Sequence, residues 1–370
     1  LSKNNLYPFK SKLELPLTKP VTKTRLDLSN KKSFMLKNWK LENSPLVPIF
    51  HIEKKNDKET EIWIHTNSIA ERIDFTNKDI TDFFDKNMES YPLSNKWKSY
   101  LGEEIIKASD FKIGVKNQAI SICMILNNNF EIVNYSFHLT YVKCGLILDD
   151  KQIEALANRK SKTRIISRIL KPIKEFIGDI DSLIEVSTKF RKDQVEKGKI
   201  EIANYENSIE SINEYFVHTP ANYFNEYLSP LSIKDINTFL SPILYEADAI
   251  WFNHSYKCKL ANASYKDQNL DYININELIK QSNLISDDIE LDDEGTSSLS
   301  SVFNLCNDQD KKRILNKFLI NGIRYNHIKI LQGDHKKSEN LTGLAPWTLP
   351  TYDYVNLINQ YNIFNLHKNG

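Results

Sequence analysis

Strand-like and helix-like patterns are segregated along this chain, and this segregation limits the possible folds more than any other feature. Runs of apolar and β-branched residues occupy 46–53, 61–67, 118–126 and 130–136, whereas the apolar spacing after Asp149 is helical. A chain whose strands precede its helices favours an α+β fold, with one sheet covered by helices. We therefore expect a strand-rich part over 26–148 and a helix-rich part over 149–370.

Two hairpins are predicted in the strand-rich part. The charged segment 54–60 separates the first two runs, which indicates two strands joined by a surface turn. Asn127, Asn128 and Asn129 separate the second two runs, and Asn tolerates the left-handed backbone that a tight turn requires.

The helix-rich part predicts helices over 150–157, 163–177 and 179–197, with shorter helices over 79–88 and 309–320. A helix over 232–252 has Ser232 as its expected N-cap and Pro242 as its expected kink. Near the C-terminus, Pro350 and Thr351 indicate a helix start. The apolar face of that last helix is formed by Tyr354, Leu357, Ile358 and Tyr361.

Two further segments differ from this pattern. Residues 1–25 are rich in Lys and are interrupted by Pro8, Pro16 and Pro20, so we expect an extended basic arm before a single domain over 26–370. Residues 286–301 are dense in Asp, Glu and Ser without the spacing of a calcium-binding loop, which predicts a solvated acidic loop.

Composition restricts partners and compartment. The formal net charge is +1, so any affinity for nucleic acid has to come from local patches. The longest apolar run, 119–126, is far shorter than the roughly 20 residues of a membrane span, so no membrane partner is expected. The four cysteines lack a CxxC pair, which favours a reducing compartment, the cytoplasm or an organellar matrix, and argues against zinc.

The segment 343–360 resembles part of the ribonuclease II family (RNB domain), in which an aromatic residue and Thr-Ser-Pro lead through two basic residues into an apolar helix. Here the Ser has become Leu349, and the two basic positions have become Tyr352 and Asp353. The matching frame consists of Trp347, Thr348, Pro350, Tyr354, Leu357, Ile358 and Asn359.

Weaker matches follow in the family's order. Residues 61–68 resemble the family strand Val-His-Ile-Ala-Asp, with His65 on the matching His, which we expect to be a buried structural residue. Further matches lie at 90–93, 117–122, 139–141 and 183–198. The resemblance covers about 26–360 and implies an RNB-like mixed β-sheet core surrounded by helices.

Family members that are exoribonucleases shorten RNA from its 3′ end and hold Mg²⁺ with four aspartates. Mg²⁺ activates water and takes hard carboxylate ligands, so the aspartates are essential to that chemistry. The four matching positions here fall at about Asn38, Ser44, Leu46 and Val47, and no Asp occurs from 28 to 56. The resemblance therefore implies no metal ligand and no cofactor.

The family also uses an Arg in the Thr-Ser-Pro segment to steady the phosphate. No Arg follows Arg324 here, and Asp353 would repel a phosphate at that place. Because both halves of the active site have changed, no catalytic residue is expected, and the chain is interpreted as a pseudoenzyme.

Two tyrosines and one basic run are candidate RNA contacts. Tyr91 and Tyr141 match positions where the family stacks RNA bases, and stacking contributes about 1–3 kcal/mol per base without sequence readout. A role as core or cleft-lining tyrosines stays open. The basic run over 159–174 forms either a phosphate-contacting rim or a solvated helix face. Its candidate RNA contacts are Lys160, Lys162, Arg164 and Arg168.

Three functions are consistent with these features. The first is an inactive RNB protein that binds single-stranded RNA or serves as a structural subunit of an RNA-processing or ribonucleoprotein assembly. The second is a protein-interaction scaffold that does not contact RNA. The third is an active Mg²⁺-dependent 3′-5′ exoribonuclease whose ligands have moved, for example to Asp74 or the acidic loop.

Overall fold

The computed structural model describes residues 24–36, 45–78, 80, 90–93, 96–157, 159, 166–196, 236–258, 260, 262–265, 328–331 and 345–368. Its strands are β1 (Leu26–Asp27), β2 (Phe34–Leu36), β3 (Ile49–Lys54), β4 (Thr60–Asn67), β5 (Tyr91–Leu93), β6 (Lys96–Lys98), β7 (Asn117–Leu126), β8 (Ile132–Val142), β9 (Leu146–Leu148), β10 (Asn262–Tyr265) and β11 (Ile328–Leu331). Its helices are η1 (Ala70–Arg72), α2 (Glu103–Ser109), α3 (Asp150–Ala157), η2 (Lys171–Phe176), α4 (Ile177–Glu196), α5 (Ile236–Lys257) and α9 (Tyr354–Lys368).

A seven-stranded mixed sheet organises the domain, in the order β1-β8-β7-β4-β3-β2-β9. The central strands pair antiparallel, whereas β1 pairs parallel with β8 and β2 pairs parallel with β9. Two small antiparallel pairs, β5-β6 and β10-β11, complete the described strands. The α+β fold with a mixed sheet and surrounding helices, predicted from the sequence, is confirmed.

The two parallel pairs form one bent ribbon. Residues 26–36 and 140–148 run side by side from β8 to β3, although β7 and β4 lie between these two strands in the sheet order. At the bend, Ser33 Oγ donates to Lys143 O at 2.7 Å and Gly145 N donates to Ser33 O at 3.0 Å. A Cβ on Gly145 would lie 3.3 Å from Ser33 O, so glycine permits this close approach.

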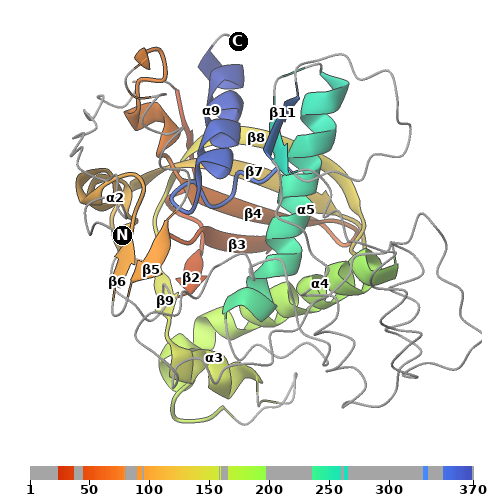
Figure 1. Cartoon of the computed structure of the whole chain (residues 1–370). Coiled ribbons are helices and arrows are strands. Elements are labelled where there is room, and N and C mark those ends of the chain that lie inside the picture. Colours follow the sequence, from red (N-terminus) through yellow and green to blue (C-terminus); the bar gives the residue numbers. More distant parts are fainter. Residues whose placement is uncertain are drawn as a thin grey trace, which may run out of the picture.

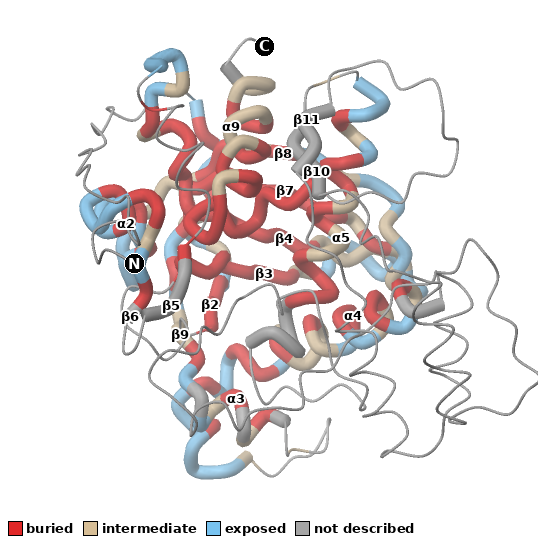
Figure 2. The backbone as a smooth tube through the Cα atoms, in the orientation of Figure 1, coloured by how far each residue is buried: buried red, intermediate tan, exposed pale blue. Residues whose placement is uncertain are grey.

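Helices α5 and α9 cover one face of the sheet (Figure 1). The ring of Phe137 on β8 meets Trp251 of α5 edge-on at 5.6 Å and Trp347 at 5.7 Å, centroid to centroid. Helix α4 packs along α5 and against β3. Buried residues concentrate in the central strands and in the helix segments next to them (Figure 2), so this layer is the hydrophobic core.

Several predicted elements are confirmed. The strand pairs β3-β4 and β7-β8 form the two predicted hairpins, and α3 has the predicted bounds. Helix α4 contains most of the segment 179–197, and α5 contains Pro242 as expected. The predicted acidic loop 286–301, most of the predicted helix over 79–88, the predicted helix over 309–320, Ser232 and most of the basic arm lie outside the described residues.

Three local predictions are corrected by the structure. The predicted helix over 163–177 is wrong in its described part, because 166–170 are not helical, 171–176 form a 3₁₀ helix and Ile177 begins α4. Pro172 lies in the first turn of the 3₁₀ helix, where proline is favoured, so it marks a helix start rather than a helix interior. In the β7–β8 turn the positive φ, 59°, belongs to Phe130 and not to an Asn. The last helix begins at Tyr354, later than Pro350 and Thr351 indicated.

No helix among the described residues is both long enough and apolar enough to span a membrane.

Candidate functional site

The segment before β3 lies against the segment before α9, although they are far apart in sequence. The backbone N–H of Leu46 donates to Thr351 Oγ1 at 2.8 Å, and both residues are buried. These are the two segments in which the resemblance places the metal ligands and the phosphate-binding residues. The structure thus brings Leu46 and Val47 close to Tyr352 and Asp353.

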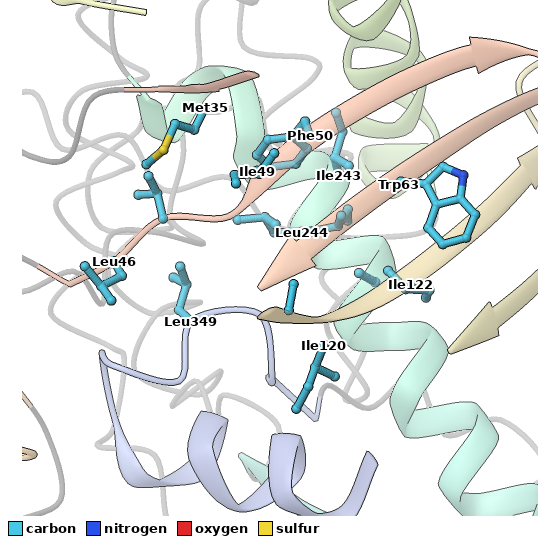
Figure 3. Close-up of a cluster of buried hydrophobic side chains, with 14 of the residues drawn as sticks. Met35, Leu46, Ile49, Phe50, Trp63, Ile120, Ile122, Ile243, Leu244 and Leu349 are labelled. Atoms are coloured by element: carbon cyan, nitrogen blue, oxygen red, sulfur yellow. The ribbon is translucent and has the colours of Figure 1, made fainter. Parts of the chain in front are cut away.

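The side chains at this junction are apolar and packed. Leu46, Val47 and Leu349 are 4%, 1% and 1% exposed, which leaves no solvent-filled space around them. Figure 3 shows Leu46 and Leu349 in one cluster with Ile49. Such side chains offer no oxygen ligand of the kind that Mg²⁺ requires.

Hydrogen bonds also tie down the backbone of the segment before α9. Ser90 N donates to Tyr352 O at 2.7 Å, and Ser90 Oγ donates to Thr351 O at 2.8 Å. The hydroxyl of Tyr100 lies 2.5 Å from Pro350 O and 2.9 Å from Asp353 O. Burial raises the pKa of Tyr100 well above its usual value, so this hydroxyl stays a donor. These carbonyl groups are therefore committed to the fold.

Asp353 is the N-cap of α9. Its Oδ1 accepts from Asn356 N at 2.7 Å and from Asn356 Nδ2 at 3.0 Å, and the residue is 4% exposed. This is the usual N-cap geometry, in which a carboxylate satisfies an unpaired N–H in the first turn. Tyr352 beside it is also buried, so neither side chain lies on an open surface.

Sequence reasoning missed a buried carboxylate next to this segment, Asp248 on α5. Its Oδ1 accepts from Trp347 N at 3.0 Å, and Thr348 Oγ1 lies 3.4 Å from its Oδ2. Burial raises the pKa of Asp248 well above its usual value, and the charge of Asp353 raises it further. The only signal in the sequence is one acidic residue within the apolar stretch 247–252.

The described residues contain no group of three His, Cys, Asp or Glu side chains that could hold a metal ion. Two of the four family positions, Asn38 and Ser44, lie outside the described residues. Asp74 is exposed, and its Oδ1 accepts from the backbone and hydroxyl of Thr76 as a local turn cap.

Of the candidate RNA contacts, the structure places Tyr141 most completely. It is half-buried near the end of β8, where Lys116 Nζ lies 4.5 Å and Arg25 Cζ 5.8 Å from its ring centroid. Lys116 also pairs with Asp27 at 2.6 Å. A base that stacks on this face of Tyr141 would have to displace Lys116 from the ring. The structure thus adds one exposed cation, Lys116, to a position that the sequence marked only as aromatic, because Arg25 is buried and paired with Glu71.

The other candidates are dispersed or not described. Arg168 lies exposed in the turn 166–170, and its three companions Lys160, Lys162 and Arg164 lie outside the described residues. Tyr91 is in β5, and its side chain is not described. The basic run as an RNA contact therefore stays a prediction.

His65 is a buried structural residue, as predicted. Its Nδ1 lies 2.8 Å from Ser121 Oγ and its Nε2 lies 3.3 Å from His51 Nδ1. Ser121 Oγ in turn lies 2.6 Å from Thr140 Oγ1, so a buried polar chain crosses β3, β4, β7 and β8. Burial, and secondarily the neighbouring His51, holds the pKa of His65 well below its usual value.

The chain is similar to known proteins over nearly its whole length. The model of the family described as RNB domain matches residues 25–369. The Mycoplasma genitalium RNase R in complex with ribose-methylated single-stranded RNA is 13% identical, with a TM-score of 0.72, covering 92% of this chain and 50% of that one. No curated protein sequence matches.

Two other solved structures share the fold. Yeast Ssd1, described as a pseudonuclease, is 12% identical with a TM-score of 0.69, covering 98% of this chain and 43% of that one. An active-site mutant of the Dss1 exoribonuclease from Candida glabrata is 11% identical with a TM-score of 0.63, covering 94% of this chain and 41% of that one. The chain therefore spans half or less of the length of these relatives.

Proposed function

Because this chain belongs to the RNB domain family, we propose that it is a catalytically inactive member that binds single-stranded RNA. It would act as an RNA-binding or structural subunit of an RNA-processing or ribonucleoprotein assembly. The observation that carries this proposal is the packed junction of Leu46, Val47 and Leu349, where the family resemblance expects carboxylates.

Loss of catalysis follows from the chemistry of that junction. Hydrolysis of a phosphodiester at neutral pH requires a metal that activates water and neutralises charge on the phosphate. Apolar side chains at Leu46 and Val47 offer no ligand, and Asp353 is engaged as a helix cap. The similarity to a pseudonuclease, Ssd1, supports the same conclusion.

Retention of RNA binding is supported by two points. The structures of RNase R similar to this chain were solved with single-stranded and with double-stranded RNA. In this chain the half-buried ring of Tyr141 lies beside one exposed cation, Lys116, whose Nζ is 4.5 Å from the ring centroid, whereas Arg25 on the same ring is buried and paired with Glu71. Rings and cations together are the usual means of holding single strands without reading their sequence.

The test is a pair of measurements on one purified preparation. Labelled oligoadenylate is incubated with Mg²⁺ or with EDTA, and its binding is measured by filter retention across a salt series. We expect no mononucleotide release in either buffer and an affinity that falls steeply with salt. An EDTA-sensitive release of mononucleotides would contradict inactivity. Complete absence of binding at low salt would instead favour the scaffold function.

A further inference from the structure

A second polar region lies at the far end of β3, away from the junction described above. A pocket of about 730 Å³ is formed there by the C-terminal half of β3, the ribbon residues 30–32, the β7–β8 turn and the start of α4. His51, the β3 residue of the pocket nearest Val47 in sequence, lies four residues after it, which at about 3.3 Å per residue is roughly 13 Å. None of Leu46, Val47, Thr351 and Asp353 lines it.

His51 lines this pocket and is the end of the buried polar chain. The residue is 2% exposed, and its Nε2 has no hydrogen-bond partner in the structure. The nearest carboxylate oxygen, Glu53 Oε2, lies 3.9 Å away, too far for a hydrogen bond. A buried polar atom without a partner costs about 1–3 kcal/mol, so a ligand that pairs with it is favoured.

The hydrogen positions along the chain identify what His51 presents. In one arrangement every group donates to the next one in the direction of Thr140, so that Ser121 donates to Thr140. The buried Thr140 hydroxyl would then need another acceptor for its own hydrogen, and none is found among the described residues. If each hydrogen points the other way, Thr140 donates to Ser121, Ser121 to His65, and His65 to His51 Nδ1. Every hydroxyl hydrogen is then used, and His51, which lines the pocket, carries an Nε2–H without an acceptor in the structure.

Phe130 in the β7–β8 turn is the second independent observation. It lines the same pocket, with φ at 59°, a region that bulky side chains rarely adopt and that costs of order 1 kcal/mol. Asn127 stabilises the turn by accepting from Asn129 N and Glu131 N, both at 2.9 Å. The turn therefore holds an aromatic ring at the pocket at some conformational cost.

Charges of both signs line the pocket. Lys54 and Lys32 are exposed, and Lys32 Nζ donates to Glu175 O at 2.9 Å. Asp179 and Glu185 belong to α4 and form no ion pair among the described residues. Lys31 is already paired with Glu53 at 2.5 Å. The lysines would therefore attract an anionic group of a ligand. The carboxylates of α4 would accept hydrogen bonds from donor groups of the same ligand.

We propose that this pocket binds a nucleotide, with the base accepting from His51 and lying beside Phe130, and the phosphate at Lys32 and Lys54. A nucleobase supplies a carbonyl or ring-nitrogen acceptor for His51, N–H donors for the α4 carboxylates and a planar face for the phenyl ring. An amino acid would match the charges but leave Phe130 and most of the volume unused. The pocket volume lies within the usual range for small-molecule sites.

The test uses the whole chain and isothermal titration with uridine and adenosine 5′-monophosphates. His51→Asn keeps an acceptor near the Nδ1 position for His65 and removes only the donor that faces the pocket. Phe130→Asn removes the ring and suits the positive φ. We expect at least one nucleotide to bind and each variant to weaken it about tenfold, the loss of one hydrogen bond or one stacking contact. Val133→Ala, exposed and outside the pocket, is the matched control.

Binding of neither nucleotide, or equal affinity in wild type and both variants, would overturn the proposal. Thermal unfolding establishes that the variants are folded, and Phe130→Asn carries the test if His51→Asn does not fold. Competition with labelled oligouridylate separates the two sources of nucleotide: displacement by the monophosphate identifies a unit of an RNA strand, and binding without displacement identifies a free nucleotide. The proposal is separable from the RNA-binding function. A chain that retains RNA but binds no mononucleotide would contradict the pocket proposal and leave the RNA-binding function unaffected.

Discussion

The backbone N–H of Leu46 donates to the side-chain hydroxyl of Thr351 across 305 residues of sequence. This bond joins the segment before β3 to the segment before α9, in the region where the family resemblance places catalysis. Thr351 is fully buried, so water cannot replace the bond if it is lost.

We first predict that Thr351→Val lowers the free energy of unfolding by about 1–3 kcal/mol, because it leaves the N–H of Leu46 buried and unsatisfied. Urea denaturation followed by circular dichroism measures the change. The matched control is Thr188→Val on α4, an exposed position where the expected change is within about 0.5 kcal/mol. Equal stability of wild type and Thr351→Val would show that the bond contributes nothing.

A second prediction concerns restoring carboxylates. Leu46→Asp combined with Val47→Asp should unfold the domain and yield no nuclease, because both positions are buried among apolar side chains. Isolated charges at such positions cost several kcal/mol, comparable with the whole stability of a domain. Soluble yield and thermal unfolding measure the effect, with Val133→Asp at an exposed strand position as control. A folded double variant that degrades RNA with Mg²⁺ would show instead that the junction is an open metal site.

How far the sequence predicts this structure depends on whether the signal is local. The two hairpins were predictable because alternating apolar runs and turn residues lie within 20 residues of each other. The break at 166–170 was not, because the apolar residues around it keep helical spacing. The resemblance predicts only that Asp353 would repel a phosphate, whereas the structure shows it as a helix cap that accepts from Asn356 N.

The candidate site shows the same limit. The resemblance ordered the segments around Leu46 and Thr351 correctly, but no pattern in the chain encodes a hydrogen bond over 305 residues. Asp248 was missed because one acidic residue in an apolar helix carries no sign of its partner, Trp347 N. The chain from His51 to Thr140 was missed because its members lie on four separate strands and meet only through strand register.

The third prediction is a pH dependence from His51. Burial, as the largest cause, lowers the pKa of His51 from 6.5 to about 4; Glu53 and Glu61 act against it and Lys31 acts with it. Between these values the unfolded chain binds a proton that the folded chain does not, so stability rises with pH from about 4 to 6.5. Lowering the pH from 6.5 to 4 should therefore lower the free energy of unfolding by about 3 kcal/mol through the titration of His51.

His51→Asn removes this titration, so the difference in unfolding free energy between wild type and variant should change by that amount between pH 6.5 and 4. Chemical denaturation at several pH values measures it, and the subtraction cancels the contributions of titrating groups that His51 does not affect. If the difference in unfolding free energy between wild type and His51→Asn stays constant with pH, His51 has the same pKa in the folded and in the unfolded chain.

The last prediction concerns the exposed cation at Tyr141. Lys116 Nζ lies 4.5 Å from the ring centroid, so it can contact a phosphate of a strand whose base stacks beside Tyr141. We expect Lys116→Ala to weaken oligoadenylate binding and to reduce the slope of log affinity against log salt by about 0.7, the value for one phosphate contact on a single strand.

Lys107→Ala provides the comparison, because Lys107 carries the same charge as Lys116 and is an exposed lysine on α2 that pairs with Glu103 one turn earlier. The slope of log affinity against log salt for Lys107→Ala should equal that of wild type. Tyr141→Ala should lower affinity by about 1–3 kcal/mol with the salt slope unchanged, since stacking releases no counterion. If both lysine variants change the slope equally, the attraction is diffuse and the pair of Tyr141 and Lys116 is not the RNA contact.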